Sequence, residues 1–348
     1  MKQICVLGSL NIDMTLFVPH FNAPGETVTG TSLQIFTGGK GGNQAVACAR
    51  LGAPVKMIGC LGSDANGAMY REALRREGVD ASGVETCADV PSGAAFIEVT
   101  PEGENRIALA AGANGRLTPE RVRSRESEIA ACGLYLTQLE NPLEAIAEGL
   151  RIAHAHGLTA ILDPAPARPL PDELLALCDI VTPNETELRI LTGMPSDTLE
   201  EAAAAARSLI ERGARLVLNK RGAAGALLVS AGECRVFPGF PVNAVDTTAA
   251  GDSFNAGLAV GLAEGLGLEE AIRLANATGA LSTTQAGAQP AMPTRAQAEA
   301  LIHCHTLRHT TQSSASRVQP ACSSAPSSPS GDSFSSNRSL SGKTQPRR

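Results

Sequence analysis

The sequence predicts an α/β fold in which a mostly parallel sheet is flanked by helices. Short apolar runs rich in β-branched residues alternate with helical patterns from residue 3 to about residue 305, as in sheets that are covered by helices on both faces. Several of the helical stretches end at a glycine, such as Gly52, Gly78, Gly157 and Gly213. Aromatic residues make up only 3% of the chain and Trp is absent. The core must therefore be built from Ala, Val, Leu and Ile.

The apolar runs predict strands near 3–8, 55–60, 133–138, 158–162, 178–182 and 214–219. The helical patterns predict helices near 41–51, 64–77, 118–131, 142–156, 197–212, 250–265, 268–281 and 294–303.

Two stretches interrupt this alternation, residues 12–36 and 92–111, and each resembles a pair of antiparallel strands. The second has a turn at 101–104. Together they predict a small β-sheet lid at the edge where open α/β sheets bind their ligands. Pattern alone leaves a second interpretation equally open, in which they are simple edge hairpins.

The last part of the chain differs in composition, because residues 306–348 are rich in Ser and Pro and lack apolar periodicity. Such a segment buries too little surface to order itself, so we predict a globular domain at 1–305 and a disordered tail at 306–348. The net charge is −6, and the tail has six Lys/Arg and one Asp, so the domain carries −11. This acidic balance argues against nucleic acid as a partner.

The nine cysteines are scattered and show no paired spacing typical of a zinc or redox site. Reduced thiols are typical of a cytoplasmic protein. The N-terminus enters a strand-like run directly, without the features of a targeting peptide. We therefore expect a cytoplasmic protein without a membrane segment.

Three stretches carry residues suited to chemistry. The glycine run 38–43, with Lys40 and Asn43, precedes a helical pattern, so its backbone can approach a small polar ligand closely. It matches neither a phosphate-binding P-loop nor a dinucleotide motif. A flexible connection between strand and helix is the plainer alternative.

In the second stretch, small residues at 247–251 lead to Asp252 at a predicted helix start. Exposed amides there can stabilise the charge of a phosphoryl group in transfer, and Asp252 can accept a proton from an attacking hydroxyl. Taken alone, Asp252 would more simply be a helix-capping residue.

The third stretch is Asn184-Glu185-Thr186-Glu187, after a strand-like run. Asn184 and Glu187 have the spacing of a capping box. The same pair can hold Mg²⁺ through water molecules, and the two roles are compatible.

Together these stretches resemble the ribokinase-like (PfkB-type) carbohydrate kinases, from residue 3 to about residue 303. The resemblance is carried in family order by strings at 8–13, 24–27, 38–43, 138–142, 163–167, 182–187, 246–252 and 287–290. It implies a Rossmann-like ribokinase fold with a small β-sheet lid that closes over the sugar and forms a homodimer contact.

The resemblance also implies an enzyme that uses ATP and Mg²⁺ to phosphorylate D-ribose at O5, with Asp252 as the catalytic base. Ala249, Ala250 and Gly251 would form the anion hole beside this base. The implied sugar contacts are Asn11, Ile12, Asp13, Gly39, Lys40, Gly41, Gly42, Asn43, Glu140 and Asp252.

By the same resemblance, ATP would contact Asn184, Lys220, Arg221, Gly222, Ala223, Ala224, Gly225, Gly251, Asp252 and Asn276. Glu187 would act on Mg²⁺ through water. A K⁺ ion would be held by Asp246, Thr248, Ser282, Gln285, Gly287 and Ala291, mostly through backbone carbonyls.

Two positions depart from the family pattern. Lys220 and Arg221 place two cations in the nucleotide loop, and Ala291 lacks a hydroxyl that often completes the potassium site. Two alternatives therefore stay open: a kinase for deoxyribose, another small sugar or a nucleoside, and a non-catalytic sugar-binding regulator.

Overall fold

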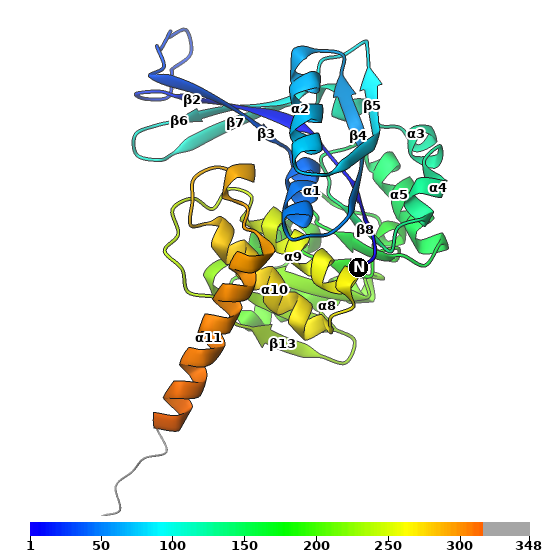
Figure 1. The fold of residues 1–348 in the computed structure, drawn as a ribbon, viewed down its shortest axis with the longest axis vertical. Helices are drawn as coiled ribbons and strands as arrows, with labels where there is room; N and C mark the ends of the chain where they lie inside the picture. The colour runs from blue at the N-terminus through cyan, green and yellow to red at the C-terminus, as the bar shows by residue number, and fades with distance from the viewer. Residues whose placement is uncertain (316–348) are drawn as a thin grey trace, which may run out of the picture. The chain divides into compact units, whose positions relative to one another are not determined.

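The computed structural model describes residues 1–315, and its largest element is a nine-stranded sheet within those residues (Figure 1). The strand order is β13-β12-β11-β10-β9-β8-β1-β4-β5. Neighbouring strands are parallel from β11 through β5, and only β12 and β13 are antiparallel to their neighbours. The predicted mostly parallel sheet is therefore confirmed.

The strands of this sheet are β1 (Ile4–Leu7), β4 (Val55–Gly62), β5 (Asp80–Cys87), β8 (Leu134–Thr137), β9 (Thr159–Leu162), β10 (Ile180–Val181), β11 (Leu216–Lys220), β12 (Ala226–Ser230) and β13 (Cys234–Phe237). The helices are α1 (Lys40–Arg50), α2 (Ala65–Arg76), α3 (Pro119–Arg123), α4 (Glu126–Ala130), α5 (Leu143–Ala155), α6 (Asp172–Leu175), α7 (Glu185–Thr192), α8 (Leu199–Glu211), α9 (Ala250–Glu264), α10 (Leu268–Ser282) and α11 (Arg295–Ala315).

Six of these strands match the predicted ones, whereas β5, β12 and β13 were not predicted. Strand β5 alternates buried and exposed positions and includes a glycine, and β13 is mostly exposed, so neither has a long apolar run. The single helix predicted at 118–131 is two short helices, α3 and α4.

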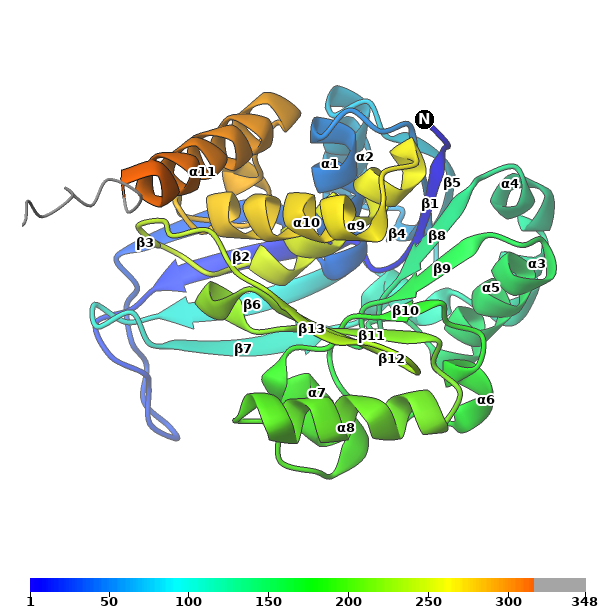
Figure 2. The ribbon, with the colours of Figure 1, turned by 90° about the horizontal axis from the view of Figure 1, so that it is seen from below.

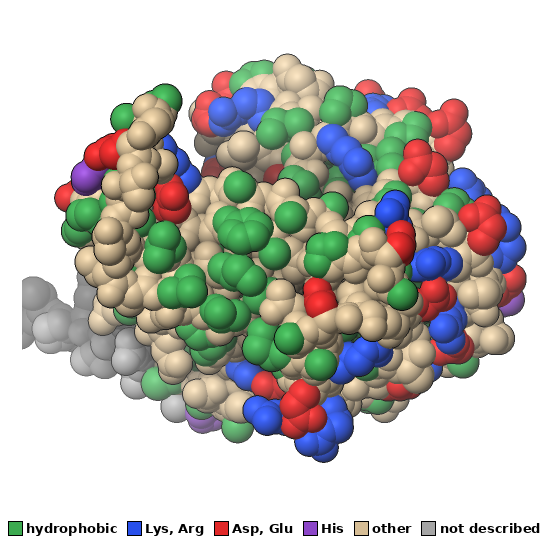
Figure 3. Space-filling model, turned by 90° about the horizontal axis from the view of Figure 1, so that it is seen from above, with side chains coloured by type: hydrophobic (Ala, Val, Ile, Leu, Met, Phe, Trp, Pro, Cys, Tyr) green, Lys and Arg blue, Asp and Glu red, His purple; other side chains and the backbone are tan. Residues whose placement is uncertain are grey.

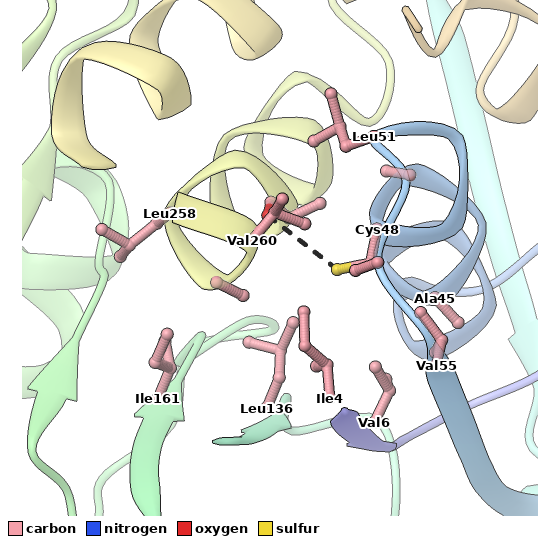
Figure 4. Packing of buried hydrophobic residues seen from close by; sticks show 14 of the residues in the cluster. Ile4, Val6, Ala45, Cys48, Leu51, Val55, Leu136, Ile161, Leu258 and Val260 are labelled. Carbon is pink, nitrogen blue, oxygen red and sulfur yellow. Dashed lines mark hydrogen bonds between the residues drawn. The ribbon is translucent and has the colours of Figure 1, made fainter. Parts of the chain in front are cut away.

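The large sheet is covered on both faces, with α1, α9 and α10 on one side and α5, α7 and α8 on the other (Figure 2). Each side has its own apolar core, and both cores consist mainly of Ala, Val, Leu and Ile. Figure 4 shows the first core, where Ile4, Leu136 and Ile161 of the sheet pack toward Cys48 of α1 and Val260 of α9. These buried strands fix the sheet edge on which the candidate site lies.

The second sheet has four strands within the described residues, in the order β3-β2-β6-β7. They are β2 (Asn11–Phe17), β3 (Ser32–Gly38), β6 (Gly93–Val99) and β7 (Asn105–Ala110). The pairs β2–β3 and β6–β7 are antiparallel, as predicted, and β2 joins β6 in parallel. We call this sheet the lid.

Large apolar side chains of the lid are exposed to solvent. The most exposed are Leu33, Ile35, Phe36, Phe96, Ile107 and Leu109. In Figure 3, hydrophobic side chains gather near the middle of the face shown, and charged side chains lie mainly near its edge. Exposed apolar surface of this kind is typical of a surface that contacts another molecule.

Helix α11 continues to Ala315, beyond the end near residue 303 that the pattern predicts. No Gly or Pro stands between Pro293 and Pro320 to stop it. Residues 306–315 are therefore helical, and the remainder of the predicted tail, 316–348, lies outside the described residues. Among the helices of the described part, none has the length and apolar character needed to span a bilayer.

Candidate active site

The carboxyl ends of five neighbouring parallel strands, β1, β8, β9, β10 and β11, lie along one edge of the large sheet. Strand order reverses at β1, because β4 and β5 lie on one side of it and the later strands lie on the other. Open α/β sheets bind ligands at such a point. The polar residues that follow these strands are therefore brought together although they are far apart in the sequence.

The glycine run joins lid strand β3 to helix α1, and its glycines are required by geometry. Gly39 has φ 81°, a backbone conformation that favours glycine. A Cβ on Gly41 would collide with the backbone of Gly8, and one on Gly42 would collide with the Tyr70 hydroxyl. The run is thus a close-packed connection that delivers Lys40 and Asn43 to the site, and not a flexible linker.

Asp252 lies in the first turn of α9 and is 4% exposed. Its Oδ2 accepts a hydrogen bond from Asn43 Nδ2 at 3.0 Å, and its Oδ1 accepts one from Gln44 Nε2 at 3.0 Å. Burial raises the pKa of Asp252 above its usual value, while the Lys40 charge and these two amides oppose the rise. A capping residue would bind amides of its own helix; Asp252 instead receives side-chain amides from α1.

The residue before this helix, Ala249, has φ 58° and is the only non-glycine residue with positive φ among those described. Backbone strain of this kind is found mainly at functional sites. The residues Ala249, Ala250 and Gly251 line the same cavity as Asp252. Their position at a helix N-terminus suits them to an anion.

Two residues outside the predicted site belong to its centre, Gln44 and Asp163. Gln44 is fully buried, and its Nε2 donates to both Asp252 Oδ1 and Asp163 Oδ2, the latter at 2.9 Å. Its Oε1 accepts from Gln138 Nε2 at 2.6 Å. One amide thus joins two carboxylates whose charges would otherwise repel each other. Asp163 directly follows β9, which was a signal available in the sequence.

Glu140 is the centre of a second cluster near the lid. Its Oε2 accepts hydrogen bonds from the Ser9 hydroxyl, from Asn11 Nδ2 at 3.4 Å and from the Lys40 backbone N–H at 3.2 Å. The Asn11 Oδ1 accepts from Asn114 Nδ2 at 2.7 Å. Ser9 and Asn114 were not predicted as site residues. Ser9 orients Glu140 and Asn114 orients Asn11, both of which were predicted.

Asp13 and Lys40 are charged groups with altered pKa values. Burial, together with the charges of Glu140 and Asp252, raises the pKa of Asp13 to about 7. Burial alone would lower the pKa of Lys40, but Asp252 and three other carboxylates raise it above its usual value, so Lys40 stays charged. The Asp13 carboxyl packs against Gly38, where any Cβ would collide with it. Ile12, in contrast, has its side chain in the core.

A cavity of about 460 Å³ extends from Asp252 along the sheet edge. The residues that line it are Lys40, Asp163, Asn184, Glu185, Thr186, Glu187, Lys220, Gly222, Thr247, Ala249, Ala250, Gly251 and Asp252. The predicted anion-hole residues, the predicted base and half of the predicted ATP contacts therefore share one cavity.

The capping box predicted at the start of α7 is present. Asn184 Oδ1 accepts from the Glu187 N–H, and Glu187 Oε2 accepts from the Asn184 N–H, both at 2.7 Å. Burial raises the pKa of Glu187, although the positive charge of Lys220 opposes this. The capping role leaves Glu187 on the cavity wall.

Lys220 and Arg221, the two cations that differ from the family pattern, have different partners. Lys220 Nζ is 2.7 Å from Asp163 Oδ1 and 3.8 Å from Glu187 Oε2, and its side chain is 10% exposed. Arg221 does not line the cavity; it pairs with Glu185 at 3.0 Å and donates to the Asp197 carbonyl. Lys220 is therefore part of the site and Arg221 supports the loop.

The rest of the nucleotide loop is a short 3₁₀ turn, η2 (Gly222–Ala224), with positive φ at Gly222 and Gly225. Ala223 and Ala224 do not line the cavity. Asn276 is buried and donates to the carbonyls of Phe237 and Pro238, so it fastens the chain that follows β13.

The predicted potassium ligands lie in two segments that hydrogen bonds connect. Asp246 Oδ1 accepts from the Thr248 N–H and hydroxyl, and Asp246 Oδ2 accepts from the Gly287 N–H at 2.8 Å. Burial alone would raise the pKa of Asp246, but these hydrogen bonds hold it below its usual value. Ser282 donates to a carbonyl of its own helix, and Gln285 and Ala291 line a separate hollow of about 190 Å³.

The donor atoms fit the cations that the resemblance implies. Within the described residues no group of three or more His, Cys, Asp or Glu is placed to hold a metal. Asp163 and Glu187 nevertheless offer two carboxylates on one cavity wall, which suits Mg²⁺ that is also bound by phosphates. Asp246 and the carbonyls near it offer oxygen donors of the kind that binds K⁺.

Comparison with known proteins agrees with this geometry. The sequence matches the pfkB family carbohydrate kinase over residues 1–295. A ribokinase of Haemophilus influenzae is 46% identical over 294 residues, which cover 84% of this chain and 96% of that protein. A ribokinase of Bacillus subtilis is 41% identical over 304 residues, or 87% of this chain and 100% of that protein.

A solved structure of Arabidopsis thaliana ribokinase complexed with ribose and ATP has a similar fold. Its TM-score is 0.83 at 35% identity, and the match covers 86% of this chain and 98% of that one. The chain therefore belongs to the pfkB family of carbohydrate kinases. Within that family it is similar to ribokinases along nearly their whole length.

Proposed function

We propose that this protein transfers the γ-phosphoryl group of ATP to O5 of D-ribose and releases ADP and D-ribose 5-phosphate. The single observation that carries the proposal is the position of Asp252. It is a buried carboxylate at a helix N-terminus, with both oxygens oriented by amides, between a polar cluster near the lid and a cavity with two carboxylates. The similarity to ribokinases supports ribose as the sugar.

The reaction requires one new bond and one broken bond. The O5 atom bonds to the γ-phosphorus, the bond from that phosphorus to the leaving ADP oxygen breaks, and Asp252 accepts the proton of the O5 hydroxyl. Amides at 249–251 face the charge that develops on the transferred group. Bound Mg²⁺ supplies charge neutralisation on the phosphates.

The residues near the lid read the sugar in this proposal. Asp13, Asn11 and Glu140 offer acceptors and donors at the end of the lid, and Asn43 and Lys40 lie beside Asp252. A site that pairs each hydroxyl discriminates against sugars that lack one, because a buried polar group is then left unsatisfied.

ATP would lie in the 460 Å³ cavity. Asn184, Gly222 and Gly251 line it, and Lys220 adds a positive charge beside Asp163 and Glu187. Asn276 and residues 223–225 are further proposed ATP contacts, and Asn276 also donates to the Phe237 and Pro238 carbonyls.

We also propose a K⁺ ion at the loop that contains Asp246 and Thr248, near Ser282, Gln285, Gly287 and Ala291. The hydrogen bonds that Asp246 accepts from the Gly287 and Thr248 N–H groups join both segments of that site. Since the same loop continues into the anion hole at 249–251, an ion there would hold the hole in place.

The lid is the proposed homodimer contact. Its exposed Leu33, Ile107 and Leu109 are each more than half exposed, and burying such residues against a second copy stabilises both.

A coupled assay of ADP release tests the proposal with pentoses, deoxyribose, hexoses and nucleosides, each with and without K⁺. We expect the highest kcat/KM with D-ribose and activation by K⁺. Preference for deoxyribose, another sugar or a nucleoside would overturn the substrate, and absence of ADP release with every compound would favour a sugar-binding regulator.

A further inference from the structure

A buried glutamine outside the predicted site, Gln289, connects the lid to the catalytic carboxylate. It begins the short 3₁₀ turn η3 (Gln289–Ala291) and is 6% exposed. Its side chain contacts three elements that are remote in sequence: the end of β3, helix α2 and helix α1. No part of the chemistry described above explains such a placement.

The hydrogen bonds around Gln289 have a defined direction, and the starting point is the Gly38 carbonyl. A carbonyl oxygen only accepts, so the Tyr70 hydroxyl that bonds to it must donate. Because the single proton of that hydroxyl is directed at the Gly38 carbonyl, the hydroxyl oxygen accepts from Gln289 Nε2, 3.2 Å away. The Gln289 Oε1 then faces the Thr37 hydroxyl at 2.5 Å, which donates to it.

The orientation of Gln289 in turn determines the orientation of Asn43. Gln289 Nε2 also donates to Asn43 Oδ1 at 3.3 Å, which leaves Asn43 Nδ2 to donate to Asp252 Oδ2 at 3.0 Å. If the Asn43 amide were flipped, its oxygen would face the Asp252 carboxylate and its NH₂ would face the NH₂ of Gln289. Both contacts would be unfavourable, so Gln289 selects the orientation that serves the base.

The backbone of Gln289 is itself held firmly. Arg50 Nη1 donates to the Gln289 carbonyl at 2.5 Å and to the Met292 carbonyl at 3.2 Å. The same guanidinium pairs with Glu77. Arg50 thus fixes the turn, and the Gln289 side chain enters the site from a rigid support.

We propose that Gln289 is a positioning residue, which acts through Asn43 to orient the Asp252 carboxylate for proton transfer. It touches neither sugar nor ATP in this proposal. Through Thr37 and Tyr70 it also joins that orientation to the end of lid strand β3. The inference rests on the proposed role of Asp252 as base.

Several charged or titratable groups face Asp252 from the surrounding elements, and a substitution at Gln289 leaves each of them in the chain. They are Lys40 from α1, Asp163 after β9 and Asp13 from β2. Tyr70 from α2 lies behind Asn43. A change in the pH dependence of Gln289 variants is therefore attributable to the amide chain.

The test uses Gln289→Leu in the full chain. We expect kcat to fall about tenfold, as for loss of one hydrogen bond to a charged group, while KM for ribose and for ATP changes less than about twofold. The acid limb of kcat should move to higher pH, because Asp252 loses an oriented donor that favours its charged form. Gln289→Glu should reduce kcat at least as much, since an ionised carboxylate has no N–H for Asn43 or Tyr70.

Tyr70→Phe is the milder comparison, because Gln289 keeps its bond to Asn43; we expect a smaller fall in kcat. Gln3→Leu is the matched control, since Gln3 precedes β1 at the end opposite the site, where its Oε1 accepts from the Cys132 thiol, and the change should leave kcat unaltered. Thermal unfolding is measured for each variant, and if Gln289→Leu does not fold, Gln289→Glu and Tyr70→Phe decide.

Unchanged kcat and an unmoved acid limb in a folded Gln289 variant would overturn this inference, as would a fall confined to thermal stability. Failure of the proposed function is a different result, since the unaltered protein would then not phosphorylate ribose at all.

Discussion

The two sheets of this molecule differ in how deeply their strands are buried. Strand β1 of the large sheet is completely buried on both faces, whereas β2, which follows it after three residues, is mostly half-buried and belongs to the lid. The lid also exposes Leu33 and Ile107, each at 58%. The comparison shows that the large sheet is fully buried beneath the candidate site, whereas the lid keeps apolar side chains exposed to solvent.

Polar groups show the same contrast. At the edge of the large sheet, Asp163 and Asp252 share the Gln44 amide, and Lys220 pairs with Asp163. On the lid, Asp13 is the carboxylate that faces this cluster, and burial together with neighbouring negative charge raises its pKa to about 7. We therefore expect changes at the sheet edge to affect the chemical step and changes on the lid to affect sugar binding.

The largest effect should follow from Asp252→Asn, which keeps the shape but removes the proton acceptor. We expect kcat to fall about 10³-fold, within the range for loss of a general base. Ribose binding, measured by calorimetry because the chain has no Trp, should stay within about threefold of the unaltered protein. Near-normal turnover with sugar bound would contradict the role of Asp252 as base. It would also contradict the assignment of the chemical step to the edge of the large sheet.

Lys220→Met should have the next largest effect. It removes the charge beside Asp163 and Glu187 in the cavity, and loss of one electrostatic contact of this kind lowers kcat/KM for ATP about 10²-fold. Lys56→Met is the matched control, because Lys56 also pairs with two carboxylates, Asp80 and Glu128, away from the site. Equal losses of activity in both variants would mean that Lys220 acts only through stability.

The raised pKa of Asp13 on the lid leads us to expect that sugar binding depends on pH. Because the pKa of Asp13 is about 7, it is neutral below that pH and ionised above it, and an ionised acceptor binds hydroxyls more strongly. KM for ribose should therefore fall several-fold, by about the strength of one such bond, as pH rises through 7. In Asp13→Asn, KM should be higher and independent of pH, although kcat keeps its own acid limb from Asp252.

The same raised pKa has a consequence for folding. Between pH 3.8, the ordinary pKa of an aspartate, and pH about 7, Asp13 binds more protons in the folded protein than in the unfolded chain. The free energy of unfolding should thus decrease as pH rises through that interval, and Asp13→Asn should lessen the decrease. Denaturant unfolding at pH 5 and pH 8 measures this difference, and an equal dependence in both proteins would contradict it.

The sequence predicts the large sheet better than it predicts the site. Apolar runs such as 133–138 and 158–162 are buried on both faces and read directly as strands. In the site, Asp252 and Glu187 stand in recognisable strings. Gln44 and Gln289 do not, because an amide becomes significant only when the fold brings it to a carboxylate or a second amide from another element.

Lys220 shows a second limit of prediction from sequence, which concerns its partner and not its position. Its position in the nucleotide loop was evident, but its partner Asp163 follows a different strand, and only the adjacency of β9, β10 and β11 brings the two together. The neighbouring Arg221, identical in charge, pairs instead with Glu185 and does not line the cavity. Sequence alone does not separate these two cations.

The smallest effect on activity should come from the exposed part of the lid. Ile107 and Leu109 point to the same face of β7, since they are two residues apart in a strand. Ile107→Glu with Leu109→Glu should convert a dimer to a monomer in light scattering, because burying two charged side chains without partners is unfavourable. We expect kcat to change by less than about threefold and KM for ribose to rise, since the rigid sheet holds the base. Ile190→Glu, at an exposed apolar site on α7, is the control. If the lid variant remained dimeric, the lid would not be the contact between copies. If its kcat fell by much more than about threefold, the lid would not be separate from the chemical step.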